Sequence, residues 1–147
     1  MCGIIGYTNN VSNNQSVIEN MLQKISHRGP DDQGYYQDSK ITLGMRRLSI
    51  IDLDSGNQPL FNEDKSLILV FNGEIYNYQV LRAKLISLGH TFTTNSDSEV
   101  IIHGYEEYGN DIVNHLRGMF AFAIYNIHTK ALFIARDIFG IKPLFYT

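Results

Sequence analysis

The chain has 147 residues, of which 44% are hydrophobic and 18% are charged, with only three prolines. This composition is typical of one globular domain that can bury a core without disulfides or metals, and it excludes a disordered or fibrous protein. The 12 basic and 15 acidic residues are not clustered and give a formal net charge of -3, so neither nucleic acid nor a membrane surface is expected as a partner.

The N-terminal segment contains a short strand and a helix. Its first residues carry no basic region and too short an apolar run for a signal peptide, and no later stretch could span a bilayer, which predicts a cytoplasmic protein. Gly3 to Tyr7 has the pattern of a strand. Ser16 to Ile25 places its apolar side chains on one face and predicts a helix, with Ser16 and Glu19 as a capping box.

The middle of the chain is rich in β-forming residues separated by turn signals. His27 to Asp32 contains Gly-Pro and several charges, which indicates a turn. Strands are expected over Ile41 to Ile51 and Leu67 to Phe71, with a loop from Asp52 to Pro59 between them. Asn72-Gly73 is expected to end the second of these strands.

The C-terminal half begins with helices. Two are predicted, each closed by a glycine: Tyr78 to Leu88 before Gly89, and Ser98 to Tyr108 before Gly109. Met119 to Tyr125 is apolar on both faces and is expected to form a hairpin with Ala131 to Ala135. A strand that needs cover on both faces predicts sheets packed between helix layers, although the pattern alone leaves the topology open.

The single cysteine lies at position two, where it can form neither an internal disulfide nor a thiolate-rich metal site. Removal of Met1 would expose an α-amino group on Cys2 itself, and such a group has an unperturbed pKa of about 7.7 to 8.0. Cys2 would then combine a nucleophile and its base in one residue. A chain that keeps Met1 would lack this base and should be inactive. The alternative is a cysteine that follows the initiator by chance.

Seven sequence blocks occur in order along the chain. They are Met1 to Gly6, His27 to Asp31, Arg47 to Asp52, Asn72 to Asn77, Ser96 to Val100, Gly118 to Ala123 and Ala135 to Leu144. Together they resemble the N-terminal domain of glutamine-hydrolysing asparagine synthetases, a class II glutamine amidotransferase domain. The resemblance implies an α+β fold of the N-terminal nucleophile hydrolase type, a four-layer αββα sandwich with two stacked antiparallel sheets.

The resemblance also implies a catalytic set. Cys2 would attack the side-chain amide of L-glutamine, and Asn72 and Gly73 would form the oxyanion hole. An Asn amide and a glycine N–H that a substrate can approach are suitable donors for a developing oxyanion. Taken alone, the Asn-Gly pair is better explained as a hairpin turn.

Free glutamine carries an α-carboxylate and an α-ammonium group, so a selective site needs a guanidinium and a carboxylate. The resemblance assigns the α-carboxylate to Arg47 and the α-ammonium to Glu74 and Asp97. Main-chain groups around Leu48, Ser49, Ile50 and Ile51 would complete the pocket. Read singly, Arg47 is a surface charge on a strand and Asp97 belongs to a helix cap. His27, Arg28 and Asp31 are expected to hold a rigid loop near the site.

The spacing of the histidines bears on metal binding, and the resemblance bears on cofactors and partners. The five histidines lie in unrelated elements without ligand spacing, so no metal site is expected and they are read as structural or solvated. The glutaminase domain is expected to span residues 1 to 147 and to need no cofactor. ATP and Mg²⁺ would serve only a synthetase domain or subunit, outside this chain, that uses the ammonia to amidate aspartate. A homodimer is left open.

Three other functions fit parts of this pattern. The chain could be a non-catalytic module that binds glutamine or docks on a synthetase. It could be a hydrolase of the same fold that acts on other amides, which would have no use for Arg47. It could also be a glutaminase domain that supplies ammonia to an acceptor other than aspartate, because relatives with other acceptors carry the same domain.

Overall fold

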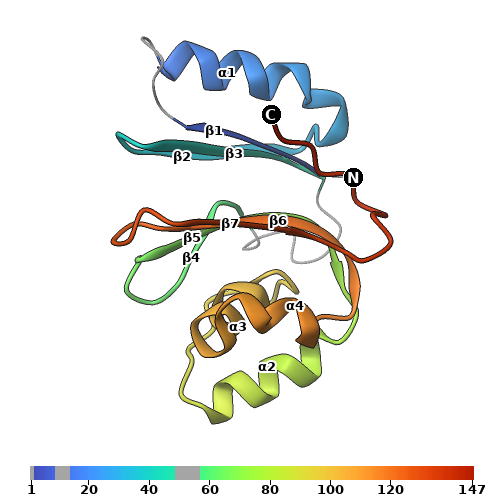
Figure 1. Cartoon of the computed structure of the whole chain (residues 1–147). Helices are drawn as coiled ribbons and strands as arrows, with labels where there is room; N and C mark the ends of the chain where they lie inside the picture. Colours follow the sequence, from blue (N-terminus) through green and yellow to red (C-terminus); the bar gives the residue numbers. More distant parts are fainter. Residues whose placement is uncertain (1, 9–13, 49–56) are drawn as a thin grey trace.

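The computed structural model describes residues 2–8, 14–48 and 57–147. Two antiparallel sheets stack face to face in it (Figure 1). The three-stranded sheet has the order β1 (Gly3–Thr8), β3 (Ile41–Arg47), β2 (Asp32–Gln37). The four-stranded sheet has the order β4 (Leu60–Phe61), β5 (Leu67–Ile75), β6 (Gly118–Asn126), β7 (Leu132–Arg136).

Helices cover the outer face of each sheet (Figure 1). The three-stranded sheet is covered by α1 (Asn14–Lys24), which the short 3-10 turn η1 (Ser26–Arg28) follows. The four-stranded sheet is covered by α2 (Tyr78–Ser87), α3 (Glu99–Tyr108) and α4 (Ile112–His115), with the turn η2 (Gly109–Asp111) between the last two. The layer order is therefore αββα, and the expected four-layer α+β fold is confirmed.

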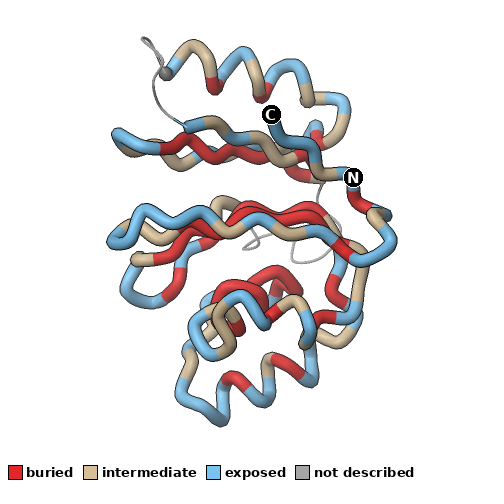
Figure 2. Tube along the Cα trace, in the orientation of Figure 1, coloured by how far each residue is buried: buried red, intermediate tan, exposed pale blue. Residues whose placement is uncertain are grey.

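Besides Ile18 and Leu22 of α1, which are buried, the described residues contain two clusters of buried hydrophobic side chains (Figure 2). One lies between the sheets and includes Leu43, Val70 and Tyr125, and the other lies between the four-stranded sheet and its helices and includes Phe122 and Leu85. Strand β6 contributes to both clusters, since Phe122 and Tyr125 lie on opposite sides of it. The prediction that this strand is covered on both faces is confirmed.

Strand β5 is longer than the sequence indicates. Asn72-Gly73 does not end it, because β5 stays paired with β6 as far as Ile75, with Asn72 opposite Ala121 and Gly73 opposite Phe120. A long antiparallel partner supplies hydrogen bonds that outweigh the local turn preference of Asn-Gly. The residues expected to form a turn therefore lie inside a sheet.

Helix ends follow the sequence in part. The glycines expected to close α2 and α3 have positive φ, +107° at Gly89 and +56° at Gly109, as helix-terminating glycines commonly do. The capping box is wrong, because α1 begins at Asn14 and Ser16 lies inside the helix.

The strand expected to reach Ile51 ends at Arg47, with residues 49–51 outside the described ranges. The short β4 and α4 were not predicted.

No helix in the described part of the chain is both long enough and apolar enough to cross a lipid bilayer.

Candidate active site

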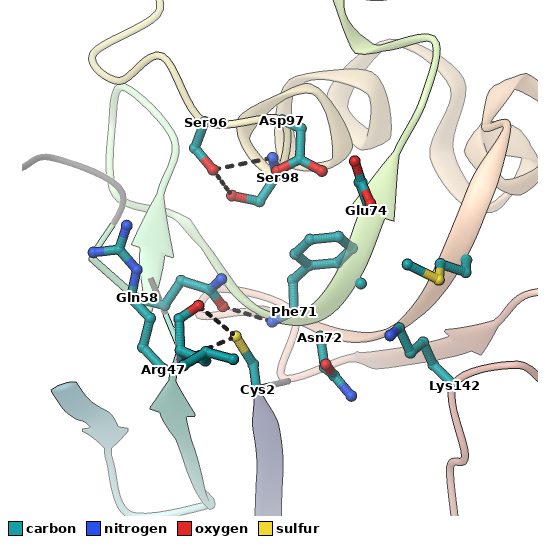
Figure 3. A pocket seen from close by; sticks show the side chains of 13 residues that line it. Cys2, Arg47, Gln58, Phe71, Asn72, Glu74, Ser96, Asp97, Ser98 and Lys142 are labelled. Atoms are coloured by element: carbon teal, nitrogen blue, oxygen red, sulfur yellow. Dashed lines mark hydrogen bonds between the residues drawn. The ribbon is translucent and has the colours of Figure 1, made fainter. Parts of the chain in front are cut away.

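A pocket opens where the N-terminal end of β1 meets the C-terminal ends of β3 and β5 (Figure 3). Segments far apart in sequence line it: Cys2, Arg47, Leu48, Gln58, Phe71, Asn72, Gly73, Glu74, Ser96, Asp97, Ser98, Met119 and Lys142. Every predicted site residue that the structure describes is in this lining. Ser49, Ile50 and Ile51 lie outside the described residues.

Cys2 is half-buried at the start of β1, and its thiol faces the end of β3. The backbone N–H of Leu48 lies 3.5 Å from Cys2 Sγ, and the Leu48 carbonyl oxygen lies 3.7 Å from it. A thiol can donate to the carbonyl, whereas a thiolate can accept from the N–H, so this pair of groups can accompany either protonation state. Arg28 donates from Nε and Nη2 to the Cys2 carbonyl oxygen, each at 3.3 Å, which fixes the residue that carries the thiol.

Strand pairing determines where the Gly73 N–H points. The N–H and C=O of Phe120, the residue opposite Gly73, bond to the carboxylate and N–H of Asp137, so Gly73 and Phe120 form a non-hydrogen-bonded pair. The Gly73 N–H therefore points away from β6. Two residues to either side, the N–H of Phe71 donates to Gln58 Oε1 and that of Ile75 donates to Asp97 Oδ2, both at 2.7 Å. This edge of β5 faces the pocket lining.

Gly73 also has a packing reason to lack a side chain. A Cβ at this position would lie 2.2 Å from the Met119 carbonyl oxygen and 2.8 Å from Phe120 Cα, both in the backbone of β6. A close approach of this kind is expected for a non-hydrogen-bonded pair in an antiparallel sheet. The neighbouring Asn72 is a buried polar residue in the wall of the pocket (Figure 3).

Asp97 is a buried carboxylate in the wall opposite the thiol (Figure 3). It is only 5% exposed, and burial raises its pKa above the usual 3.8, as does the negative charge of nearby Glu74, although the N–H of Ile75 opposes the rise. Among the described residues, the ion pairs do not include Asp97. Two adjacent carboxylates at a pocket wall favour a cationic ligand group.

Positive charge lies elsewhere in the same lining. Arg47 is buried at the end of β3, and its Nη1 donates to Asn57 Oδ1 at 2.7 Å, which holds the guanidinium in place. Lys142 is also buried and reaches the pocket from the C-terminal segment (Figure 3). The pocket thus combines cationic and anionic side chains, which suits a zwitterionic ligand.

Several lining residues were missed by sequence reasoning. Gln58 orients the edge of β5 through Phe71, and the Ser96 and Ser98 hydroxyls bond to each other at 2.6 Å beside Asp97. Lys142 was noted only as part of a sequence block. Its burial could not be deduced, because it depends on the C-terminal segment crossing back to the pocket.

Two of the sequence blocks have structural roles. Gly29 lets the turn after α1 contact β3, since a Cβ there would lie 2.4 Å from the Arg46 carbonyl carbon. Asp137 is buried and accepts hydrogen bonds from the backbone N–H groups of Phe120, Phe139, Ile141 and Lys142. These bonds hold the segment that brings Lys142 to the pocket.

The histidines are not all isolated from one another. His90 and His103, which lie 13 positions apart in sequence, have ring centroids separated by 5.1 Å. The expectation that the histidines sit in unrelated surroundings is wrong for this pair, because the end of α2 packs beside α3. The pair lies outside the pocket lining.

The fold defines a class. The four-layer sandwich with two stacked antiparallel sheets is the fold of N-terminal nucleophile hydrolases. The solved structure of glutamine phosphoribosylpyrophosphate (PRPP) amidotransferase from B. subtilis, complexed with ADP and GMP, superposes with a TM-score of 0.71. The match covers 92% of this chain and 36% of that chain at 22% identity, and it shows the fold alone.

The family model of the glutamine amidotransferase domain matches residues 1–147, so the chain belongs to this family. It is 48% identical over 152 residues to asparagine synthetase [glutamine-hydrolyzing] 1 of Bacillus subtilis (strain 168), covering 100% of this chain and 24% of that protein. It is 45% identical over 148 residues to asparagine synthetase [glutamine-hydrolyzing] 2 of Arabidopsis thaliana, covering 99% and 25%. The chain spans about a quarter of the length of these relatives.

Proposed function

We propose that this domain hydrolyses the side-chain amide of L-glutamine to glutamate and ammonia, with Cys2 as the nucleophile. The observation that carries the proposal is the convergence on one pocket of the Cys2 thiol, the Gly73 N–H edge and side chains of both charges. Membership of the glutamine amidotransferase family supports the same reaction.

The proposed binding mode matches each charge of glutamine with an opposite charge. Arg47 binds the α-carboxylate, and Asp97 with Glu74 binds the α-ammonium group. The raised pKa of Asp97, which burial and Glu74 produce, supports this assignment, because a cation at this position would relieve both unfavourable effects. Main-chain groups of Leu48, together with those of Ser49, Ile50 and Ile51 outside the described residues, would complete the pocket in this proposal.

The proposed reaction has two stages. After removal of Met1, the Cys2 thiolate attacks the amide carbon, and the negative charge that forms on oxygen is stabilised by the Asn72 amide and the Gly73 N–H. The α-ammonium group of Cys2 donates a proton to the leaving nitrogen, the C–N bond breaks, and ammonia departs from a γ-glutamyl thioester. Water, deprotonated by the α-amine, then cleaves the thioester to release glutamate and the thiol.

We propose further that the ammonia passes to a synthetase domain or subunit that amidates aspartate. The names of the asparagine synthetases that this chain resembles support this partner. ATP and Mg²⁺ would be needed by that partner, and the glutaminase reaction itself uses only groups of this chain. A cytoplasmic location stays a prediction.

The first experiment measures the intact mass of the purified protein together with glutamate release from glutamine. We expect loss of one methionine and steady glutamate formation. Cys2→Ala should lose glutamate release by several orders of magnitude, as removal of a catalytic nucleophile does. Alanine at position two still permits methionine removal, so this variant tests the thiol alone.

Three further results would overturn parts of the proposal. Methionine loss without glutamate formation, in the presence of the synthetase partner, would indicate a non-catalytic glutamine-binding or docking module. Equal turnover of glutamine and of 4-aminobutanamide, which lacks the α-carboxylate, would indicate a hydrolase of other amides. Glutamate release with no amidation of aspartate would indicate a different acceptor.

A further inference from the structure

A second group of polar side chains lies outside the pocket lining, beside α3. It consists of Glu63, His90, His103 and Glu106, which we call the histidine–glutamate cluster. One donor atom from each of the four residues lies within 4.8 Å of the corresponding atom of every other. Both imidazoles turn Nδ1 toward the carboxylates of the cluster.

The spacing of these donors fits a tetrahedral metal ion. His90 Nδ1 lies 3.5 Å from Glu63 Oε1 and 3.6 Å from Glu106 Oε2. His103 Nδ1 lies 3.4 Å from Glu63 Oε2 and 3.2 Å from Glu106 Oε2. Bonds of 2.0 to 2.1 Å to a tetrahedral Zn²⁺ place neighbouring ligand atoms about 3.3 Å apart, so small movements of the side chains suffice to form such a site.

Each histidine of the cluster is also oriented by a contact of its other ring nitrogen, Nε2. His90 Nε2 lies 2.9 Å from Glu107 Oε1, and His103 Nε2 lies 3.4 Å from Glu99 Oε1. A histidine that ligates a metal through one nitrogen commonly donates the other N–H to a carboxylate, which fixes the tautomer and the ring. The two Nε2 contacts therefore present both Nδ1 lone pairs to the space between the carboxylates.

The carboxylates are held in a similar way. The Thr91 N–H donates to Glu63 Oε1 at 2.9 Å, and the Asn62 amide donates to Glu106 Oε1 at 2.8 Å. Such partners outside the ligand set hold carboxylate ligands at metal sites and influence metal affinity.

The backbone places the cluster on well-determined elements. His103 and Glu106 lie three residues apart on one face of α3. The N–H of His90 bonds to the Leu85 carbonyl at the end of α2, which sets its position relative to that helix. Glu63 lies in the turn between β4 and β5. A metal ion would therefore join three separate segments.

Ion pairing without a metal is the main alternative. Hydrogen bonds between an imidazolium and a carboxylate are usually 2.7 to 2.9 Å long. Three of the four Nδ1 contacts in the cluster are 3.4 Å or longer, which is long for such bonds but suits two ligands of one ion. The short contact of His90 is instead made by Nε2, which lies 2.9 Å from Glu107 Oε1.

We propose that the histidine–glutamate cluster binds one divalent transition-metal ion, with Zn²⁺ as the best match, in a structural site that joins the end of α2, α3 and the β4–β5 turn. Two imidazole nitrogens favour Zn²⁺ over Mg²⁺ or Ca²⁺, which prefer oxygen ligands, and two carboxylates neutralise its charge. His103 is 1% exposed, whereas the Glu63 and Glu106 side chains are 38% and 26% exposed, so an ion enters from the carboxylate side.

The test begins with the full chain stripped of metal by a chelator and titrated with Zn²⁺ by calorimetry. Bound metal is counted by elemental mass spectrometry, and thermal unfolding is followed with and without Zn²⁺. We expect one Zn²⁺ per chain and a midpoint of unfolding that rises by several degrees when the ion binds. Co²⁺ in the same site should give the visible absorption of a tetrahedral complex.

Variants at the surface side of the cluster keep the test independent of folding. His90→Gln and Glu106→Gln should each weaken Zn²⁺ binding by at least tenfold, and Glu107→Gln by roughly tenfold through loss of the contact with His90 Nε2. His115→Gln, which changes a histidine that stacks on Tyr108 and pairs with Asp111 rather than with the cluster, is the matched control and should bind as the unchanged chain does.

Zinc could also bind the thiol in the active site, so every titration is repeated on Cys2→Ala. Unchanged stoichiometry in that variant supports the proposal. Loss of Zn²⁺ binding in Cys2→Ala, or no saturable binding by any form of the chain, would overturn the proposal. Binding by His90→Gln and Glu106→Gln as tight as that of the unchanged chain would also overturn it. Glutamate release is measured separately and bears on Cys2 alone, so the two proposals fail independently.

Discussion

Of the two carboxylates predicted to bind the α-ammonium group, Asp97 is buried whereas Glu74 is exposed. Asp97 faces Glu74, and its hydrogen bond from the Ile75 N–H offsets only part of the cost of its charge. An ionised carboxylate of this kind makes the empty pocket less stable and makes the binding of a cation more favourable. Asp97 therefore lowers the stability of the free protein and raises its affinity for a cationic substrate group.

Asp97→Asn should raise KM for glutamine by roughly 10- to 100-fold, because it removes a hydrogen bond between charged groups that is worth about 1.5 to 3 kcal/mol. The asparagine oxygen can still accept from the Ile75 N–H, so the backbone of β5 stays in place. Steady-state glutamate release measures the effect. Glutaramate, which lacks the α-ammonium group, is the control substrate, and its hydrolysis should change little. An equal loss with both substrates would contradict the assignment.

Asp97→Asn should also alter the dependence of stability on pH. The folded-state pKa of Asp97 lies above the usual 3.8, so the unchanged protein loses stability as the pH rises from 3.8 through the raised pKa. The variant lacks this loss. The free energy of unfolding is measured in urea at pH 3.5 and pH 7. Relative to the unchanged protein, the variant should be more stable at pH 7 than at pH 3.5. The same difference at both pH values would contradict the effect of burial.

At the scale of elements, Asp38 connects the two sheets. It follows β2, accepts hydrogen bonds from the backbone N–H groups of Lys40 and Ile41, and accepts from Tyr125 Oη on β6 at 2.9 Å. Lys130 forms an ion pair with it at 3.3 Å. Burial alone would raise the Asp38 pKa, but the two N–H groups, Tyr125 and Lys130 together lower it to about 2.

Asp38→Asn should lower the free energy of unfolding by about 2 kcal/mol at pH 7, because the folded state favours the charged form by nearly two pKa units. The folded-state pKa is depressed, so this contribution is present above the unfolded value of 3.8 and is lost as the pH falls to about 2. Urea unfolding at pH 7 and pH 2 measures both limits. The exposed Asp111→Asn is the matched control, and a difference at pH 2 as large as at pH 7 would contradict the electrostatic origin.

At the scale of the whole molecule, the segment after β7 exposes large apolar side chains. Ile138 and Phe139 are 93% and 85% exposed, and Ile141, Phe145 and Tyr146 are also exposed. Apolar side chains grouped in this way mark an interaction surface. Since the curated relatives are about four times as long as this chain, we expect the proposed synthetase partner to cover them.

Ile138→Ser with Phe139→Ser should leave the stability of the domain within about 0.5 kcal/mol, because the two side chains contact little of it. Glutamate release should persist, whereas glutamine-dependent amidation should fall at least tenfold and amidation with added ammonia should not. Product formation from each nitrogen source measures this. Val80→Ser, an exposed position on α2, is the control. Unchanged glutamine-dependent amidation would remove this segment from the docking surface.

Much of the fold could be predicted from local pattern. The helices that end before Gly89 and Gly109, and the hairpin of β6 with β7, follow from periodicity and from residues that terminate elements. The end of β5 could not, because Asn-Gly has the same local preference in a turn and in a paired strand, and only β6 decides between them. The capping box failed for a related reason, since Ser16 lies in a helix that begins two residues earlier.

The sequence by itself predicted the main helices and strands and, through the resemblance of its ordered blocks, the αββα layers, the family and the candidate residues. Only the tertiary structure decided that the Gly73 N–H faces the pocket, that Lys142 and Gln58 line it, and that Asp97 is buried beside Glu74. It alone brought His90 next to His103. The physical reason is that strand pairing, burial and charge proximity depend on segments distant in the chain, which local pattern does not contain.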